Sequence, residues 1–366
     1  MLLFYLFTAL IALQTGFTLW LIWAAGPSRL RGQDNDDLPP VSVLICARNE
    51  ATHLQQFLPA VLGQDYPDFE VIVVNDASED TTGPVLDALA QRYPRLRIVT
   101  IAPDTDRFLP GKKLAIHHGV AATQYNFLLL TDADCLPASD QWLRLMTAPL
   151  RRGKTLVAGY GAYTRGKGLL NRFIRWETLH TFLQYSAYAN SGLPYMATGR
   201  NLACSKAALL QAQQSPLWAS MPSGDDDLLV RLTATSRNMA IVAVPDAFTY
   251  SPAKSSWQEW LLQKQRHVST GKLYKRPQQL LLGLYAGSHG LVWLCFILLQ
   301  CTGLGHLAWL LMLLRCTLSW FFWWSMADTL REKSLFLFFP VCDFGWACYN
   351  FALSPYIFFK TKRRWK

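Results

Sequence analysis

Long apolar segments near both ends of the chain constrain its fold more than any other feature of the sequence. Residues 1–25 contain no charged side chain, and further apolar runs cover 280–299, 304–326 and 335–359. Each run is long enough to cross a bilayer, whose hydrocarbon core needs about 20 residues of helix. The stretch between Leu38 and Arg276 contains no apolar run of that length. The sequence therefore predicts a soluble domain attached to membrane segments.

The residues beside the first segment predict its orientation. Residues 1–25 lack the basic start and the short apolar core of a cleaved signal peptide, so we expect an uncleaved anchor. Arg29 and Arg31 follow directly, and basic residues favour the cytoplasmic side. We therefore expect a multi-pass protein of the cell membrane whose soluble domain lies in the cytoplasm.

Polar residues in the later segments leave the number of spans at three or four. The residues that interrupt 335–359 are Pro340, Asp343, Asn350 and Pro355. This segment is then either a span or a re-entrant or interfacial hairpin. Arg315 lies in the middle of the preceding segment, where an unpaired charge costs about 3 kcal/mol or more. We expect its side chain to face protein or water.

Basic residues outnumber acidic ones by 35 to 25, and part of this excess lies in the tail 360–366. A basic tail beside an apolar segment favours anionic lipid as its partner and argues against nucleic acid. We divide the chain into a membrane helix at 1–26, a soluble domain at 38–278, a membrane region of two or three helical segments at 280–359, and the tail.

Short apolar runs alternate with amphipathic stretches in the soluble domain. The predicted strands are 41–46, 70–75, 96–101 and 127–132, and the predicted helices between them are 51–62, 80–93 and 112–123. Apolar strands separated by helices indicate βαβ units with parallel strands buried on both faces. We expect an α/β fold with a doubly wound sheet, in which ligands bind at the carboxyl ends of the strands.

An apolar strand that ends in two carboxylates is the strongest candidate for a metal site. In LLLTDADC, a single alanine separates Asp132 from Asp134. Side chains at i and i+2 of a strand share a face, so both carboxylates can approach one cation. Hard oxygen ligands suit Mg²⁺ or Mn²⁺, which complete their shell with substrate phosphates. The alternative is an Asp-rich turn that binds nothing.

Asp76 ends another strand that is otherwise apolar. Its carboxylate can accept a hydrogen bond from the imide N–H of uracil or from a ribose hydroxyl. The alternative is that Asp76 or Ser78 caps the helix that follows. The residues alone favour neither interpretation.

Three adjacent carboxylates, Asp225, Asp226 and Asp227, form a second acidic group. Like charges repel, so at least one pKa should rise unless cations neutralise the group. A carboxylate with a raised pKa suits a general base that takes a proton from an acceptor hydroxyl. The alternative is a solvated acidic start of the helix predicted over 226–235, where the helix dipole favours negative charge.

A basic amphipathic helix is predicted near 256–268. Ser256 and Glu259 form a capping box that starts it. Trp257 and Trp260 lie on its apolar side, as in a helix at a membrane interface.

The other face of this helix carries Gln263, Arg266 and His267, which share it by i, i+3, i+4 spacing. Arg266 is suited to hold a leaving diphosphate through a bidentate contact. The alternative is a helix that does no more than touch lipid.

The order of these motifs resembles glycosyltransferase family 2, whose members are inverting enzymes with the GT-A fold. The matching elements are VSVLICARNE, QDYPDFEVIVVNDASEDTT, GKKLAIHHG, LLLTDADC, TGRNLA, SGDDDLL and QKQRH. They extend from about Val41 to His267, and many members of the family also carry membrane segments. The resemblance implies a GT-A-type doubly wound mixed sheet, with transmembrane or interfacial helices at both ends.

The resemblance also implies roles for residues around the donor. Glu50, Asp76 and Lys112 would line the nucleotide pocket, with Asp76 on the base. Asp134 would hold the metal ion directly, with Asp132 beside it and near the ribose.

Further residues match the family's acceptor side. Residues 199–201 of TGRNLA, with Arg200 in the middle, match the family's loop beside the donor sugar and the acceptor. Asp226 fits the family's catalytic base, and Asp225 is the alternative register. The family's QxxRW pattern appears as QKQRH, in which His267 replaces the Trp and Arg266 keeps the Arg. This departure removes an aromatic platform for a sugar and argues against processive polymer synthesis.

The implied activity is the transfer of a sugar from a nucleotide-diphosphate sugar, with UDP favoured, to a hydroxyl of a lipid, a lipid-linked saccharide or a polysaccharide. Two alternatives remain. A nucleotidyltransferase of related fold should carry a glycine-rich loop after the first strand, and CARNEA contains no glycine. An inactive membrane scaffold is the other alternative, although every expected carboxylate is retained.

Overall fold

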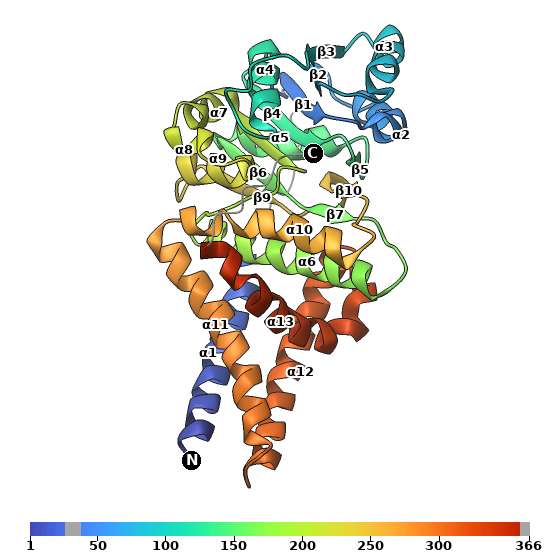
Figure 1. The fold of residues 1–366 in the computed structure, drawn as a ribbon. Coiled ribbons are helices and arrows are strands. Elements are labelled where there is room, and N and C mark those ends of the chain that lie inside the picture. The colour runs from blue at the N-terminus through green and yellow to red at the C-terminus, as the bar shows by residue number, and fades with distance from the viewer. Residues whose placement is uncertain (26–37, 359–366) are drawn as a thin grey trace. The chain divides into compact units, whose positions relative to one another are not determined.

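The computed structural model describes residues 1–25 and 38–358, and these form two compact units (Figure 1). The helical unit comprises Met1–Gly26, Arg165–Tyr188 and Lys254–Thr361, and the sheet unit comprises the rest of the described residues. Arg29, Arg31 and the basic tail 360–366, on which the predictions of sidedness and of lipid contact rest, lie outside the described residues.

The sheet unit is built on a seven-stranded sheet with the strand order β3-β2-β1-β4-β8-β6-β9. Its strands are β1 (Val41–Ala47), β2 (Phe69–Asp76), β3 (Leu96–Ile101), β4 (Phe127–Asp132), β6 (Leu156–Gly159), β8 (Leu202–Ser205) and β9 (Met239–Val242). Strands β3, β2, β1 and β4 are parallel, whereas β8 runs antiparallel to both of its neighbours. A second sheet pairs β10 (Thr249–Ser251) with β5 (Leu136–Pro137) and β7 (Gly161–Tyr163). The predicted α/β class with a mixed sheet is confirmed.

Helices cover both faces of the large sheet. The helices and 3-10 turn of this unit are α2 (Ala51–Leu62), α3 (Thr82–Arg92), α4 (Lys113–Ala122), α5 (Trp142–Arg151), α7 (Lys206–Gln213), α8 (Pro216–Ala219), α9 (Asp225–Thr233) and η1 (Pro245–Ala247). On one face, Val43 and Ile45 pack in a core with side chains from α2, α3 and α5. On the other face α4 approaches closely, because a Cβ at Gly119 would lie 2.4 Å from Leu44 Cδ1. The strands and helices predicted between 41 and 132 all form, with ends that shift by no more than two residues.

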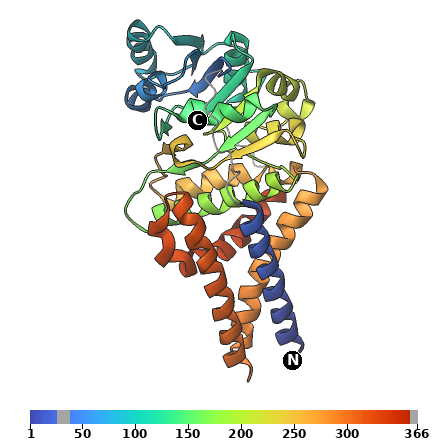
Figure 2. The ribbon, with the colours of Figure 1, turned by 180° about the vertical axis from the view of Figure 1, so that it is seen from behind.

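The helical unit contains α1 (Leu2–Ala25), α6 (Leu169–Asn190), α10 (Trp257–Val268), η2 (Gly271–Leu273), α11 (Arg276–Leu299), α12 (Gly305–Thr329), η3 (Lys333–Phe338) and α13 (Phe339–Phe358). Helices α1, α11 and α12 run side by side in both views (Figure 1, Figure 2) and bury a shared apolar core that includes Phe7, Phe296 and Met312. Among the described residues, four helices are long and apolar enough to cross a membrane: Leu2–Ala25, Arg276–Leu299, Gly305–Thr329 and Lys333–Pro355. Helices α6 and α10 belong to this unit, although both lie within the range 38–278 predicted for the soluble domain.

A buried ion pair joins two of these long helices. Arg315 on α12 donates from Nη1 to Asp343 Oδ2 over 2.8 Å and from Nη2 to Oδ1 over 3.2 Å. The ring of His289 on α11 lies 2.9 Å from Arg315 Nη2, and the Trp293 indole donates to the same Asp343 carboxylate over 3.0 Å. The prediction that Arg315 faces protein or water is confirmed, because Asp343, one of the interruptions of the last segment, is its partner.

Helix α10 starts as predicted, because Ser256 Oγ accepts a hydrogen bond from the Glu259 N–H over 3.2 Å. Trp257 on this helix is 45% exposed. The prediction of a lipid-facing tryptophan pair is wrong for Trp260, which is 2% exposed. Phe173 of α6 and Tyr349 of α13 cover its ring.

Candidate active site

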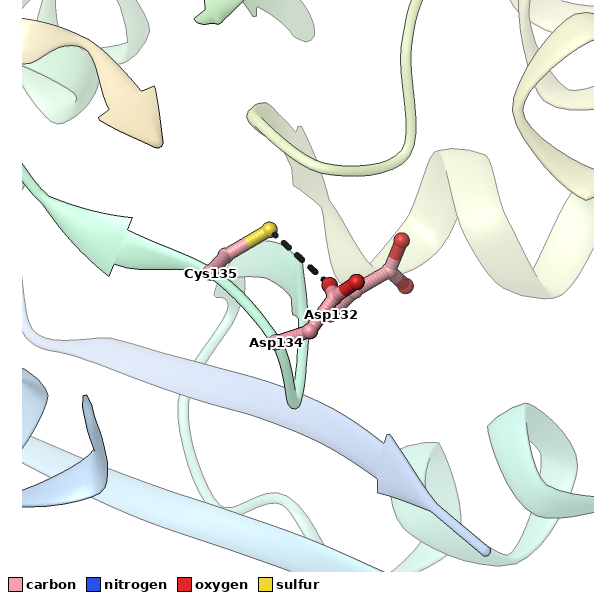
Figure 3. Close-up of side chains that lie close together, drawn as sticks. All are labelled: Asp132, Asp134 and Cys135. Carbon is pink, nitrogen blue, oxygen red and sulfur yellow. Dashed lines mark hydrogen bonds between the residues drawn. The ribbon is translucent and has the colours of Figure 1, made fainter. Parts of the chain in front are cut away.

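The carboxyl end of β4 carries the acidic pair (Figure 3). Asp132 is the last residue of the strand, and the chain turns immediately after it. The side-chain ligand atoms of Asp132, Asp134 and Cys135 all lie within 4.8 Å of one another, and the Cys135 thiol donates to Asp134 Oδ1 over 3.6 Å. The structure thus brings the two predicted carboxylates together, with the Cys135 thiol beside them.

The chemistry of this group fits a hard divalent cation. Burial raises the pKa of the Cys135 thiol, so the sulfur keeps its proton and is a poor ligand. Burial and the charge of Asp132 raise the pKa of Asp134. Carboxylate oxygens are the ligands that Mg²⁺ and Mn²⁺ prefer, and a bound cation would remove the repulsion between the two groups.

Lys112 connects the acidic pair to helix α4. It occupies the N-cap position of α4, and its ammonium group donates to Asp132 Oδ1. Burial acts to raise the pKa of Asp132, but the charge and the hydrogen bond of Lys112 together with the charge of Arg200 outweigh it, and the net shift is downward. Asp132 is therefore ionised at neutral pH and ready to bind a cation.

The carboxyl ends of β1 and β2 carry Glu50 and Asp76, the residues expected around the nucleotide. Two positive φ angles, 58° at Asn49 and 51° at Ala77, turn the chain sharply at these strand ends. The Glu50 carboxylate contacts the His53 ring over 2.6 Å.

Asp76 does not cap helix α3, which was the alternative interpretation of this residue. Asp80 accepts the Thr82 N–H at the start of that helix over 2.9 Å. Ser78 does not cap it either, because its hydroxyl accepts the Asn49 N–H over 3.0 Å. Asp76 is thus available for another role.

A partner for Asp76 comes from the loop between β3 and α4. Arg107 donates to Asp76 Oδ1 over 2.7 Å and to Oδ2 over 3.2 Å. The Asp76 side chain is fully buried, while that of Arg107 remains 34% exposed. Sequence reasoning missed Arg107, because it belongs to no motif and lies 31 residues from its partner. A nucleobase that reaches the Asp76 carboxylate must therefore displace this guanidinium.

The second acidic group forms the start of α9, after Gly224 with its φ of 77°. Asp226 accepts the Gly199 N–H at Oδ2 over 2.8 Å and the Asp227 N–H at Oδ1 over 2.9 Å. Burial and the charge of Asp225 raise the pKa of Asp226 to about 6, against the opposing effect of both N–H groups and of Lys112. The carboxylate is thus oriented by the backbone and has a pKa suited to a general base near neutral pH.

Arg200 adds positive charge near the acidic pair. Its guanidinium lies 4.0 Å above the Tyr163 ring and donates to Ser251 Oγ over 2.7 Å. Its charge acts to lower the pKa of Asp132 and of Asp134. The next residue in the TGRNLA motif, Asn201, is buried and bonds to the framework, with its amide on two backbone carbonyls.

Gln263, Arg266 and His267 lie on α10 and belong to the helical unit, whereas the other predicted site residues belong to the sheet unit. His267 is exposed, and Arg266 is partly buried. Burial lowers the pKa of Arg266.

The chain matches the model of a family described as "Glycosyltransferase like family 2" over residues 39–270. It is 27% identical over 275 residues to the probable glycosyltransferase YdaM of Bacillus subtilis, in a match that covers 73% of this chain and 62% of that protein. It is 28% identical over 244 residues to the glycosyltransferase AglE of Haloferax volcanii, covering 64% of this chain and 74% of that protein.

Two further similarities bear on acceptor and fold. The chain is 28% identical over 124 residues to the beta-monoglucosyldiacylglycerol synthase of Trichormus variabilis, covering 33% of this chain and 26% of that protein. The structure of the mannosyltransferase PcManGT from Pyrobaculum calidifontis, in complex with GDP-Man and Mn²⁺, superposes with a TM-score of 0.60 at 18% identity. That match covers 93% of this chain and 99% of the mannosyltransferase chain, so the two share a fold.

Proposed function

The chain belongs to glycosyltransferase-like family 2, and from this we propose that it is a membrane-bound enzyme that transfers a sugar from a nucleotide-diphosphate sugar to a hydroxyl acceptor. The observation that carries the proposal is the acidic pair at the end of β4, with Lys112 bonded to Asp132 and Asp226 held by two backbone N–H groups. A metal-binding group and a candidate base are the two parts that such a transfer requires.

Asp134 and Asp132 would hold Mg²⁺ or Mn²⁺. When bound, the ion supplies positive charge that stabilises the departing diphosphate. The mannosyltransferase of the same fold is described with Mn²⁺ and GDP-Man, which supports ligands of this kind here. Lys112 and Arg200 add positive charge beside the same carboxylates.

Asp226 is the proposed base. Each of its oxygens accepts one backbone N–H and keeps a further lone pair for an acceptor hydroxyl. As the acceptor oxygen attacks the anomeric carbon, its proton passes to Asp226. The bond to the diphosphate breaks on the opposite face, and the electron pair leaves with the nucleotide. One displacement of this kind inverts the anomeric configuration.

We propose UDP as the nucleotide, with Glu50, Asp76 and Lys112 lining its pocket and Asp76 on the base. The buried Asp76 carboxylate would accept the imide N–H of uracil in place of Arg107. A guanine edge offers two N–H donors to the same carboxylate, so GDP-sugars are the natural competitors in an assay.

We propose that the acceptor is a lipid or a lipid-linked saccharide. Two observations support an acceptor at the bilayer. Four helices of the described residues are long and apolar enough to span a membrane, and the chain is similar to the beta-monoglucosyldiacylglycerol synthase of Trichormus variabilis. From the resemblance to the family's QxxRW pattern, we propose that Arg266 binds the diphosphate. We also propose that the sheet unit lies in the cytoplasm, on the basis of Arg29 and Arg31.

The test uses the full chain purified in detergent or nanodiscs. UDP-sugars and GDP-mannose are supplied with membrane lipid extract, and release of free nucleotide is measured with Mn²⁺ or with EDTA. We expect release with one donor that requires both metal and lipid, and that Asp134→Ala abolishes. Asp65→Ala, which removes a carboxylate that is 64% exposed, is the matched control and should retain activity. Equal turnover in Asp134→Ala would overturn the proposal, and formation of pyrophosphate from a nucleoside triphosphate would indicate a nucleotidyltransferase instead.

A further inference from the structure

Lys113, next to the predicted site residue Lys112, is a fully buried lysine that lacks a carboxylate partner among its hydrogen bonds in the described structure. Its ammonium group donates to two backbone carbonyls, Trp218 O over 2.6 Å and Met221 O over 2.7 Å. It also lies 5.1 Å above the Trp218 ring. Burying an ammonium group costs free energy unless the group is hydrogen-bonded. Movement of either carbonyl would break such a bond, so Lys113 holds both carbonyls in place.

A second contact holds the same segment. Gly111 has a φ of 64°, and a Cβ at this position would lie 2.1 Å from Pro222 O. No side chain fits there, so the backbone before α4 and the backbone at Pro222 are in direct contact. We call residues 218–224 the base loop, because they run from the end of α8 into α9.

The base loop directly precedes the first turn of α9, which carries Asp226. Three residues separate Pro222 from Asp226, and Gly224 takes a left-handed conformation at the start of α9. The position of the loop therefore sets the position of the Asp226 backbone. Burial lowers the pKa of Lys113 to about 8, and the charges of Asp225 and Asp226 act in the opposite direction.

We propose that Lys113 is a positioning residue that fixes the base loop and thereby the reach of Asp226 toward the acceptor. Adjacent lysines then serve the two halves of the reaction, since Lys112 bonds to the metal-binding carboxylate and Lys113 to the loop that carries the base. This inference rests on the proposed function and deepens it.

Two measurements on the full chain in detergent test it. The first is hydrogen–deuterium exchange of the base loop in Lys113→Met, which removes the donors but keeps the length of the side chain. We expect faster exchange across 218–224. The second is transfer kinetics, in which we expect kcat to fall about 100-fold, the usual effect of displacing a reacting group by about 1 Å, with an unchanged KM for the nucleotide sugar.

The matched control is Lys206→Met, because Lys206 also donates to a backbone carbonyl, Thr123 O, over 2.6 Å. It should change neither measurement. Lys113→Gln keeps a hydrogen-bond donor and replaces Lys113→Met if that variant does not fold. We expect its exchange rate and kcat to change in the same direction by a smaller amount. Unchanged exchange in a folded Lys113 variant overturns the inference, and so does a raised KM with unchanged kcat. A wild-type protein that transfers no sugar defeats the proposed function, while the exchange measurement still decides whether Lys113 holds the loop.

Discussion

Replacement of Asp226 by Asn tests the chemistry and the energetics of the candidate site together. The change removes the base and keeps the shape of the side chain, so we expect kcat to fall by about 10²–10⁴-fold, the usual contribution of a general base. The wild-type enzyme should lose activity as the pH falls through about 6, where Asp226 takes up a proton. Residual activity in the variant should lack this pH dependence.

The same change should stabilise the protein at alkaline pH. Burial and Asp225 raise the Asp226 pKa from 3.8 to about 6. This rise from 3.8 to about 6 corresponds to about 3 kcal/mol of destabilisation by the ionised carboxylate. Asn removes this charge, but it has one acceptor oxygen for the N–H groups of Gly199 and Asp227, and leaving one of them unbonded costs about 1–2 kcal/mol. The expected net gain is about 1–2 kcal/mol at pH 8.

The sign of the pH dependence follows from the raised pKa. A carboxyl group whose pKa is higher in the folded state favours folding most below its unfolded pKa of 3.8, and this contribution is lost as the pH rises through about 6. The gain in stability of Asp226→Asn over the wild type should therefore reach its full size at pH 8 and be absent near pH 4.

Thermal unfolding of the full chain in one detergent at both pH values measures this difference, with Asp225→Asn as the companion variant. A lower melting temperature for Asp226→Asn than for wild type at pH 8 would refute the energetic reasoning. Loss of transfer in Asp225→Asn alone would assign the base to the other register.

Two further substitutions test contacts seen in the structure. Arg107→Ala leaves the buried Asp76 carboxylate without its guanidinium partner, so we expect the free protein to lose about 1–3 kcal/mol of stability in a thermal melt. Excess UDP should restore part of this loss. Complete loss of UDP binding would instead make Arg107 a direct nucleotide ligand. Arg315→Leu leaves the buried Asp343 charge without a partner and should lower the free energy of unfolding by about 3–5 kcal/mol. The double variant with Asp343→Leu should recover most of this loss. A double variant as unstable as the single one would contradict the pairing.

Local sequence patterns predicted the first half of the sheet unit because each part of it is encoded over a few residues. Buried parallel strands such as 41–47 appear in the sequence as apolar runs. The pair Ser256 and Glu259 likewise predicts the start of a helix. The short strands β6, β8 and β9 did not stand out, since each has four residues and its pairing depends on distant segments.

Contacts between distant residues account for what the sequence did not predict at the site. Arg107 and Asp76 lie 31 residues apart, and Lys113 and Trp218 lie 105 residues apart, with no local motif to join either pair. The burial of Trp260 depends in the same way on side chains from other helices. The carboxylates themselves could be predicted, because strand ends in an open α/β sheet gather at one edge.

Binding of Mn²⁺ in the presence of UDP tests the central claim most directly, because it reports on the acidic pair without requiring an acceptor. Electron paramagnetic resonance of the free ion, titrated with the full chain, gives the affinity. We expect the wild type and the control Asp65→Ala to bind Mn²⁺ equally well, and Asp134→Ala to bind it at least about 10-fold more weakly. Equal affinity in all three proteins would contradict the assignment of Asp132 and Asp134 as the metal site.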